Sequence, residues 1–300
     1  MRRPLGVGLG EVLWDMLPDG PQLGGAPANF AYHFNALGGQ GMIVSRVGDD
    51  DAGRRACRLL AEQGLDVSRI SVDPLHPTGR VDVLLSAQGT ASYVFPDDVA
   101  WDFLPAARAE DTLAGGAACI CFGTLCQRTP AGRAAVRSFL QAADAAVLRV
   151  FDCNLRQNFY SPEVVQDSLQ LADVFKLNEE ELDVLAPALG VADVLRDAAA
   201  RRAALHALVT RFGLQAAALT RGAQGSVLMT GESCHEHAGE MVEVADTVGA
   251  GDAFTAALAL GWLCGLPPEQ IHARAASVAA YVCGAHGAMP PMPAALRLLP

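Results

Sequence analysis

Short apolar runs alternate with longer segments of helical periodicity along most of this chain. Each apolar run has the length of a β-strand and ends in polar or glycine residues. The predicted strands span residues 5–11, 43–48, 119–122, 146–151, 174–177 and 216–220. The predicted helices span residues 26–37, 131–144, 162–172, 253–263 and 272–283, and one more begins at the acidic triplet 49–51. Because strands that alternate with helices pair in parallel, the pattern predicts an α/β fold with a mostly parallel central sheet.

Two segments depart from this alternation and predict a smaller second sheet. Residues 78–85 and 91–95 form two strand-like runs around a turn, with no helix beside them. Together with residues 12–23, this hairpin can form a lid over the carboxyl-terminal edge of the main sheet, with Tyr93 and Phe95 on one face. A lid of this kind covers a substrate, pairs with a second subunit, or does both. The predicted organisation is a single domain, residues 1–300, with lid strands inserted at about 12–23 and 78–100.

Length and charge narrow the classes of function. The 300 residues are enough for a large α/β domain, and the net charge of −11 argues against nucleic acid as a partner, which would require a basic face. No apolar run is long enough to span a bilayer, and residues 1–8 do not form the apolar core of a secretory signal. We therefore expect a cytoplasmic protein with neither a membrane nor a nucleic acid as its partner.

The cysteine and histidine residues do not form a pattern typical of a metal site. The eight cysteines include no C-x-x-C pair, so free buried thiols are expected, as in the cytoplasm. His235 and His237 would share one face of an edge strand, but two such residues with no third ligand nearby more often belong to a solvated strand. The cysteines in or beside apolar segments are Cys119, Cys121, Cys126, Cys264 and Cys283.

The heptapeptide Asp246–Asp252 lies between two segments of different period. Residues 241–245 alternate apolar and polar side chains, which predicts a half-buried strand, and residues 253–263 have almost no polar face, which predicts a buried helix. The small residues Gly249–Gly251 allow an anion to approach N–H groups at a helix N-terminus. Asp252 beside such an anion hole could take a proton from a hydroxyl group that attacks a bound phosphoryl group. A tight turn whose aspartate caps a buried helix explains the same residues equally well.

Polar residues also follow the other predicted strands. Each is by default a loop residue, but the carboxyl ends of parallel strands meet at one edge of the sheet, where all of them would line one cleft. No G-x-x-x-x-G-K-[ST] sequence is present, so the chain is not a P-loop enzyme. These residues are Asp15, Asn154, Arg156, Asn178, Glu181, Thr220 and Asp252.

A second glycine-rich turn precedes the helix predicted at residues 26–37. Gly24 and Gly25 permit close backbone approach, and Asn29 in the first helical turn offers both a donor and an acceptor to a polyol. A glycine-rich loop followed by a capping amide is the structural alternative.

The sequences GGAPAN at Gly24–Asn29 and DTVGAGD at Asp246–Asp252 resemble the paired signatures of the ribokinase-type, or phosphofructokinase B, carbohydrate kinases. The resemblance extends over essentially the whole chain and is strongest to the fructokinases. It implies a doubly wound sheet with helices on both faces and a small β-sheet lid. The segments that resemble fructokinases are Gly10–Glu11, Val99–Asp102, Phe122–Leu125 and Asp152–Arg156.

The resemblance implies that the γ-phosphoryl group of ATP is transferred to a primary sugar hydroxyl, with fructose 6-phosphate as the leading product. The implied catalytic residues are Asp252 as the base, Gly249, Ala250 and Gly251 as the anion hole, and Arg156 near the phosphates or the sugar. The candidate sugar contacts are Asp15, Gly24, Gly25, Asn29 and, from the lid, Phe95. The implied nucleotide residues are Asn178 and Glu181, which act through Mg²⁺, and Thr220, Gly222 and Gly225. Asp246 and the carbonyl group of Val248 match a K⁺ site of the family.

Two departures from the family pattern leave parts of this assignment open. Residues 275–277 are Ala-Ala-Ser where many relatives have an asparagine near the adenine, and Met289 and Met292 replace small or polar residues near the implied K⁺ site.

Several alternatives also remain for the function. The acceptor can be ribose, 2-keto-3-deoxygluconate, a nucleoside or a phosphorylated ketose, although the sugar-contacting segments contain no lysine, which favours a neutral sugar. A catalytically silent binding protein is the alternative from another class. We further expect a homodimer formed through the lid strands.

Overall fold

A nine-stranded sheet lies at the centre of the protein in a computed structural model that describes residues 3–17, 19–85, 91–107, 116–192 and 194–299. Its strand order is β13-β12-β11-β10-β9-β8-β1-β4-β5, and all pairs are parallel except β11 with β12 and β12 with β13. The strands are β1 (Leu5–Leu9), β4 (Gln40–Gly48), β5 (Asp66–Asp73), β8 (Ala117–Phe122), β9 (Leu148–Asp152), β10 (Val174–Asn178), β11 (Ala216–Thr220), β12 (Ser226–Thr230) and β13 (Cys234–His237).

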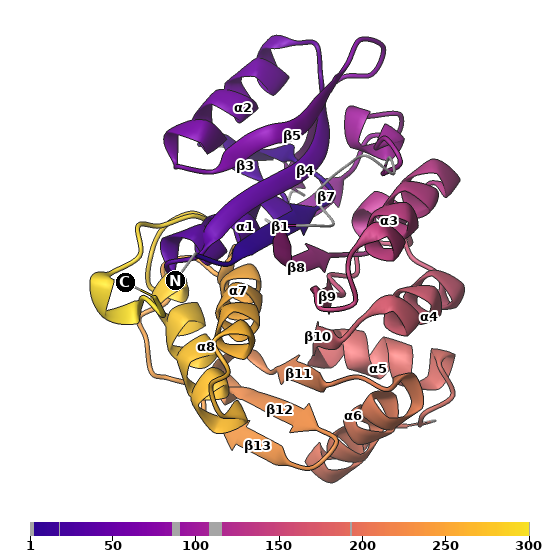
Figure 1. Ribbon diagram of the computed structural model, residues 1–300, viewed down its shortest axis with the longest axis vertical. Coiled ribbons are helices and arrows are strands. Elements are labelled where there is room, and N and C mark those ends of the chain that lie inside the picture. Colours follow the sequence, from indigo (N-terminus) through magenta and orange to yellow (C-terminus); the bar gives the residue numbers. More distant parts are fainter. Residues whose placement is uncertain (1–2, 18, 86–90, 108–115, 193, 300) are drawn as a thin grey trace.

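Helices cover both faces of this sheet, as the predicted α/β fold requires (Figure 1). Each set of helices packs its apolar side chains against the strands and forms a separate part of the core. One face carries α1 (Ala26–Ala36), α2 (Asp51–Glu62), α7 (Ala250–Leu263) and α8 (Pro268–Cys283). The other face carries α3 (Pro130–Ala142), α4 (Pro162–Leu171), α5 (Glu179–Ala188) and α6 (Ala198–Phe212).

A second sheet of four strands forms the predicted lid, in the order β3-β2-β6-β7. Strand β2 pairs antiparallel with β3 and parallel with β6, and β6 pairs antiparallel with β7. The turn between β6 and β7 and the side chain of Tyr93 lie outside the part of the chain that can be described. The strands are β2 (Leu13–Leu17), β3 (Gly20–Gly24), β6 (Gly79–Leu85) and β7 (Ala91–Val94).

Close contacts at the first turns of α1 and α2 position the elements around the site. Gly8 in β1 allows α1 to lie directly on the strand, because a Cβ atom there would lie 2.0 Å from the carbonyl oxygen of Pro27. Asp50 caps α2 by accepting a hydrogen bond from the Gly53 N–H at 2.7 Å, and it also accepts from the N–H and hydroxyl of Thr78, at the start of the lid hairpin. A helix therefore begins at the acidic triplet, as predicted, and Asp50 of this triplet also anchors the lid.

Two expectations from the sequence are wrong. Residues 241–245 form no strand but an irregular segment, in which the Met241 side chain is fully exposed. Cys264 is exposed at the C-terminal end of α7, whereas Cys119, Cys121 and Cys126 are buried as expected.

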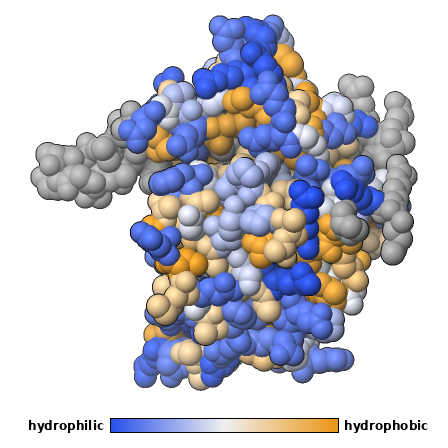
Figure 2. Space-filling model, turned by 90° about the vertical axis from the view of Figure 1, so that its left-hand side faces the viewer, coloured by the Kyte–Doolittle hydropathy of each residue, from blue (hydrophilic) through white to orange (hydrophobic). Residues whose placement is uncertain are grey.

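The outer surface of α2, at the top of the view, is mainly hydrophilic, whereas the middle of the same face mixes polar and apolar residues (Figure 2). Among the helices described, none has both the length and the apolar character needed to cross a membrane.

Candidate active site

The predicted cleft lies where the strand order reverses. Strands β4 and β8 flank β1 on opposite sides. After β1, the chain first adds β4 and β5 on one side of β1 and later adds β8 and the following strands on the other side. Ligands of open α/β sheets bind at such a switch point, outside the carboxyl ends of the strands. The N-terminal ends of α1 and α7 meet here, because Asn29 of α1 contacts Asp252 of α7 across 223 positions of sequence.

Asp252 is held in a buried and well-defined position in the first turn of α7. The Nδ2 of Asn29 donates a hydrogen bond of 2.7 Å to its Oδ2, and the residue is only 8% exposed. The pKa of Asp252 is raised to about 6, mainly by burial and also by the nearby charge of Asp152. The hydrogen bond from Asn29 and the cations Lys176 and Arg156 act in the opposite direction. A carboxylate with this pKa is ionised at neutral pH and basic enough to accept a proton from a hydroxyl group.

The residues before Asp252 form an open helix N-terminus. Gly249 is the N-cap residue of α7 with φ of 80°, and no side chain caps the helix. Among the described residues, no side chain accepts from the N–H groups of the first turn, although the Ala250 N–H donates to the carbonyl oxygen of Thr247 at 3.4 Å. The helix dipole favours an anion beside the other N–H groups. This is the geometry expected for the anion hole Gly249–Gly251.

The expected sugar-side residues also lie at this cleft. Gly25 is the N-cap residue of α1, and Asp15 of β2 lies against Gly24, where a Cβ atom would be 2.5 Å from the Asp15 Oδ2. Burial raises the pKa of Asp15 to about 6, while Arg156 lowers it. Phe95 follows the last lid strand and packs edge-on against Phe159, with 5.8 Å between ring centroids.

Arg156 is close enough to three acidic groups of the cleft to affect their ionisation. Its positive charge lowers the pKa values of Asp15, Glu11 and Asp252. The residue therefore belongs to the same site although it follows a different strand, β9.

Glu11 had no predicted role, yet it is a buried carboxyl group of this site. It is 4% exposed, and its Oε2 has no hydrogen-bond partner. The pKa of Glu11 is raised to about 7, mainly by burial and also by the charge of Asp252, against the effects of two backbone hydrogen bonds and Arg156. The signals available in the sequence were its place after the first core strand, which Asp15 shares, and the resemblance of Gly10–Glu11 to fructokinases.

Lys176 is a second group that the sequence analysis missed. It is buried in β10, and its Nζ lies 3.0 Å from Oδ1 of Asp152, at the end of β9. Burial disfavours the charge on Lys176, but the neighbouring carboxylates, Asp152 foremost, hold its pKa above the usual value. The signal available in the sequence was that this is the chain's one lysine.

A cavity of about 820 Å³ lies beside Ala250 and Gly251, on the side of α8. Thr220, Gly222 and Gly225 line it, as does Asn178, so the structure brings most of the expected nucleotide residues together. The irregular segment 238–244 forms one wall and supplies the apolar side chains of Met241, Val242 and Val244. The other residues around the cavity are Ala223, Ser226, Thr247, Ala250, Gly251, Phe254, Ala276, Ala279, Ala280 and Cys283.

Asn178 and Glu181 form a capping box at the start of α5. The Asn178 side chain accepts from the Glu181 N–H at 2.9 Å, and Glu181 Oε2 accepts from the Asn178 N–H at 2.8 Å. Glu181 Oε1 also accepts from the N–H of Leu155 at 2.9 Å, which connects the turns after β9 and β10. Both residues therefore have a structural role at this edge of the sheet.

Asp246 links the anion-hole loop to the C-terminal segment. Its two carboxylate oxygens accept hydrogen bonds from the N–H of Val248 at 3.0 Å and of Gly287 at 3.1 Å. Among the described residues, no three His, Cys, Asp or Glu side chains converge as they would around a protein-bound metal.

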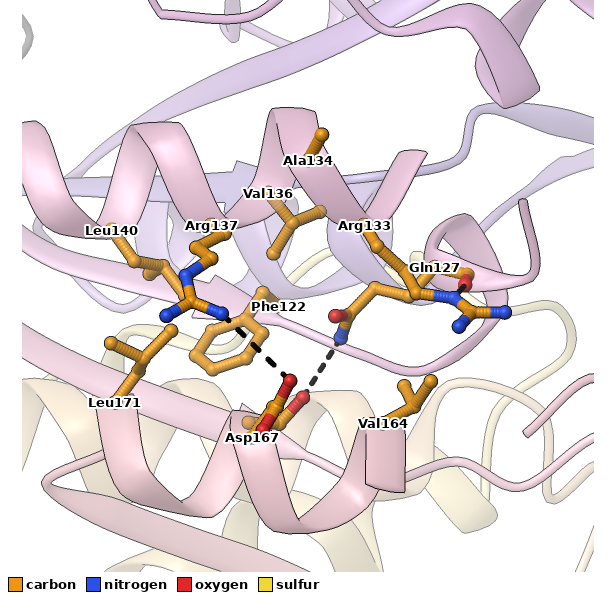
Figure 3. Close-up of a pocket in the computed structure, with 11 residues that line it drawn as sticks. Phe122, Gln127, Arg133, Ala134, Val136, Arg137, Leu140, Val164, Asp167 and Leu171 are labelled. Carbon is orange, nitrogen blue, oxygen red and sulfur yellow. Dashed lines mark hydrogen bonds and ion pairs between the residues drawn. The ribbon is translucent and has the colours of Figure 1, made fainter. Parts of the chain in front are cut away.

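A smaller cavity of about 220 Å³ lies between α3 and α4, and none of the predicted site residues lines it (Figure 3). Arg137 and Asp167 face each other across its opening with 3.9 Å between their charged atoms.

A buried carboxylate at a helix N-terminus that no side chain caps among the described residues, with a cavity beside it, suits the transfer of a phosphoryl group between two small molecules. The fold and the site thus define a small-molecule kinase. The model of the pfkB family carbohydrate kinases matches residues 21–295, and the chain belongs to that family.

Curated relatives include a fructokinase of Escherichia coli, 32% identical, and one of Klebsiella pneumoniae, 33% identical, each matched over 95% of both chains. An aminoimidazole riboside kinase of Salmonella typhimurium is 28% identical over 83% of this chain and 78% of its own.

Solved structures agree with this relationship. The ATP-bound fructokinase of Xylella fastidiosa aligns with a TM-score of 0.82 and 27% identity, over 96% of this chain and 95% of its own. A fructokinase of Vibrio cholerae with bound fructose, ADP and calcium aligns with a TM-score of 0.80 and 25% identity, over 98% of this chain and 97% of its own. The predicted doubly wound α/β fold with a β-sheet lid is thereby confirmed.

Proposed function

We propose that this protein is a fructokinase that transfers the γ-phosphoryl group of ATP to D-fructose and forms fructose 6-phosphate. The observation that carries the proposal is the Asp252 carboxylate, held by Asn29 at the open N-terminus of α7. The choice of fructose is supported by the two fructokinases that match over 95% of the chain.

The proposed reaction is one in-line displacement. Asp252 accepts the proton of the sugar's primary hydroxyl as that oxygen attacks the γ-phosphorus atom. The new P–O bond forms while the bond from the γ-phosphorus to the bridging oxygen breaks, and ADP leaves with the electron pair of that bond. The N–H groups at Gly249–Gly251 stabilise the charge on the transferring group, and Arg156 neutralises part of it.

We place the sugar between the lid and α1. Asp15 and Asn29 can bind its hydroxyl groups, and the backbone at Gly24 and Gly25 permits close approach. Phe95 would cover one face of the sugar, and closure of the lid would exclude the water that otherwise hydrolyses ATP.

We place ATP in the cavity of about 820 Å³, whose end at Ala250 and Gly251 adjoins the anion hole. Thr220, Gly222 and Gly225 would contact the phosphates. The apolar wall formed by Met241, Val242 and Val244 suits the flat face of the adenine. This wall supplies base contacts that do not depend on an asparagine at positions 275–277.

The proposed site would bind Mg²⁺ and K⁺ through different groups. Mg²⁺ usually keeps several waters and binds through substrate phosphates and one or two carboxylates, so the lack of a cluster of protein ligands among the described residues suits it. Asn178 and Glu181 would face its waters from the turn that they cap. Asp246 and the carbonyl of Val248 supply oxygen ligands for K⁺ beside the anion-hole loop. Both ions would offset the negative charge of the phosphates.

The test of this function is ADP release from MgATP in the presence of K⁺, with fructose, ribose, 2-keto-3-deoxygluconate, adenosine, aminoimidazole riboside and fructose 6-phosphate as separate acceptors. The proposal requires that fructose has the highest kcat/KM. Preferred turnover of a riboside would instead favour the activity of the Salmonella relative. Turnover with none of the acceptors would favour the non-catalytic alternative.

Arg156→Ala is expected to lower kcat/KM by roughly 10- to 100-fold, the usual cost of one charge-assisted hydrogen bond. The loss should appear in steady-state kinetics, while the thermal unfolding temperature stays close to wild type. Arg137→Ala, on the surface beside α4, is the matched control and should change neither quantity. An unchanged rate for Arg156→Ala would exclude the residue from the site.

We also propose that the protein is a homodimer joined through its lid sheets. Strands β3 and β7 form the edges of that sheet, and the apolar side chains of Met16 and Val94 are exposed on it. Sedimentation equilibrium at micromolar concentration should give a dimer, and Val94→Lys should shift it towards monomer. A wild-type monomer under these conditions would contradict the proposal.

A further inference from the structure

The only lysine of the sequence lies directly below the proposed anion hole. The side chains of Lys176 and Asp152 are each 4% exposed, with 3.0 Å between Nζ and Oδ1. The Nζ atom also lies against Gly251, where a Cβ atom would be only 2.9 Å away. The ammonium group is thus packed under the backbone that presents its N–H groups to the phosphoryl group.

The same ion pair is connected to the first turn of α7 by a hydroxyl group. Thr255 Oγ1 lies 2.7 Å from Oδ2 of Asp152 and 3.0 Å from the carbonyl oxygen of Gly251. Asp152 therefore holds Lys176 with one oxygen and Thr255 with the other. These contacts fix the ends of β9 and β10 relative to the residues that begin α7.

A gain in stability alone does not readily explain the buried ion pair between Lys176 and Asp152. Burying two charges costs desolvation free energy, and the attraction between the charges often does no more than balance this cost. Proteins in which a buried ion pair is replaced by apolar residues of similar volume are frequently as stable as the original. The position of the pair under Gly251 suggests a different use for the charge. A cation there adds positive potential where negative charge gathers during phosphoryl transfer.

We propose that Lys176 is a positioning residue for phosphoryl transfer, held by Asp152 and Thr255, which fixes Gly251 and adds positive charge beneath the Gly249–Gly251 anion hole. The inference rests on the proposed kinase function. It adds a residue that does not touch the substrate and acts through the backbone of α7. The charge of Lys176 also favours the ionised form of Asp252. The same ammonium group therefore supports both the proposed base and the proposed anion hole.

The single change Lys176→Met leaves Asp152 buried without its cation and is prone to misfold. The informative variant is therefore Lys176→Met combined with Asp152→Asn, which removes both charges. The new amide oxygen can still accept a hydrogen bond from Thr255, so the packing below α7 is largely kept. The matched control is Arg46→Met combined with Asp73→Asn, which neutralises a pair at 3.0 Å on β4 and β5, outside the proposed machinery.

Two measurements test the role. In steady-state kinetics, the double variant at Lys176 and Asp152 should lose roughly 10-fold or more in kcat, less than the 10²–10³-fold typical of a direct donor, with little change in the KM of the sugar. By calorimetry, it should bind MgADP as wild type does but bind MgADP with fluoroaluminate, a mimic of the transferring phosphoryl group, roughly 10-fold more weakly. The control pair should behave as wild type in both assays.

The outcomes separate this inference from the proposed function. A wild-type protein that binds no MgADP and phosphorylates no acceptor would overturn the function itself, and the inference with it. An active wild type together with a double variant of near wild-type kcat and fluoroaluminate affinity would overturn only the inference, because the pair would then serve the fold alone.

Discussion

Replacing Asp252 with asparagine is expected to lower kcat by roughly 10²- to 10⁴-fold, the usual contribution of a positioned general base. The amide cannot take the proton from the sugar hydroxyl. Its oxygen can still accept the hydrogen bond that Asn29 donates to Oδ2 at 2.7 Å, so the local structure should be kept. Binding of MgADP and of the sugar, measured by calorimetry, should therefore change little.

A matched control separates loss of the base from a general effect of removing an aspartate from a helix N-terminus. Asp51 lies in the first turn of α2 as Asp252 lies in the first turn of α7, but its side chain is exposed. Asp51→Asn should retain wild-type turnover. Near wild-type turnover by Asp252→Asn would remove Asp252 as the base.

The pH dependence follows from the same group. Burial raises the pKa of Asp252 from 3.8 to about 6, and only the ionised form can accept a proton. The specificity constant kcat/KM should therefore be highest at neutral pH and should fall as the pH drops through about 6. Asp15 and Glu11, whose pKa values are raised to about 6 and about 7, titrate in the same range, so the residual activity of Asp252→Asn shows which part of the fall belongs to the base.

The main elements could be predicted because buried parallel strands appear as apolar runs. Strands such as β8 and β11 are almost wholly buried, and helices such as α3 and α4 begin at the recognisable caps Thr129 and Ser161. The pattern was misleading at residues 241–245, where apolar and polar side chains alternate but the backbone forms no strand. This segment has no neighbouring strand, and its apolar side chains line the cavity beside α8.

The site could be predicted only in part, for a different reason. Asp252 and Asn29 each carried a local signal, but their contact across 223 positions depends on the packing of α1 against α7. Lys176 occupies a position of β10 that the pattern treats as core, and Glu11 follows β1 in a segment that resembles fructokinases but that indicated no role for its carboxyl group. The chemistry of both arises from burial and from neighbours on other strands, which spacing along the chain does not encode.

Gly249→Ala is expected to have the second large effect, because two physical requirements meet at this position. Its φ of 80° is a conformation that residues with a Cβ atom rarely adopt. The added Cβ would also lie 2.5 Å from the carbonyl oxygen of Ala288 and 2.8 Å from its Cα, so the backbone itself would have to move. The loop before α7 would then shift and turn the N–H groups of the anion hole away from the phosphoryl group.

The expected loss in kcat is roughly 10²- to 10³-fold, similar to the removal of one donor from an oxyanion hole, with a smaller change in the KM of the sugar. Gly284→Ala is the matched control, because Gly284 has φ of −83° and its added Cβ would meet atoms no closer than 3.5 Å. The control should keep wild-type kinetics and unfolding temperature. Wild-type kcat in Gly249→Ala would mean that the phosphoryl group is stabilised elsewhere. A loss confined to kcat, with MgADP affinity unchanged, would place the effect at the transferring group, since the cavity proposed for the nucleotide is lined by Thr220 and Gly222 but not by Gly249.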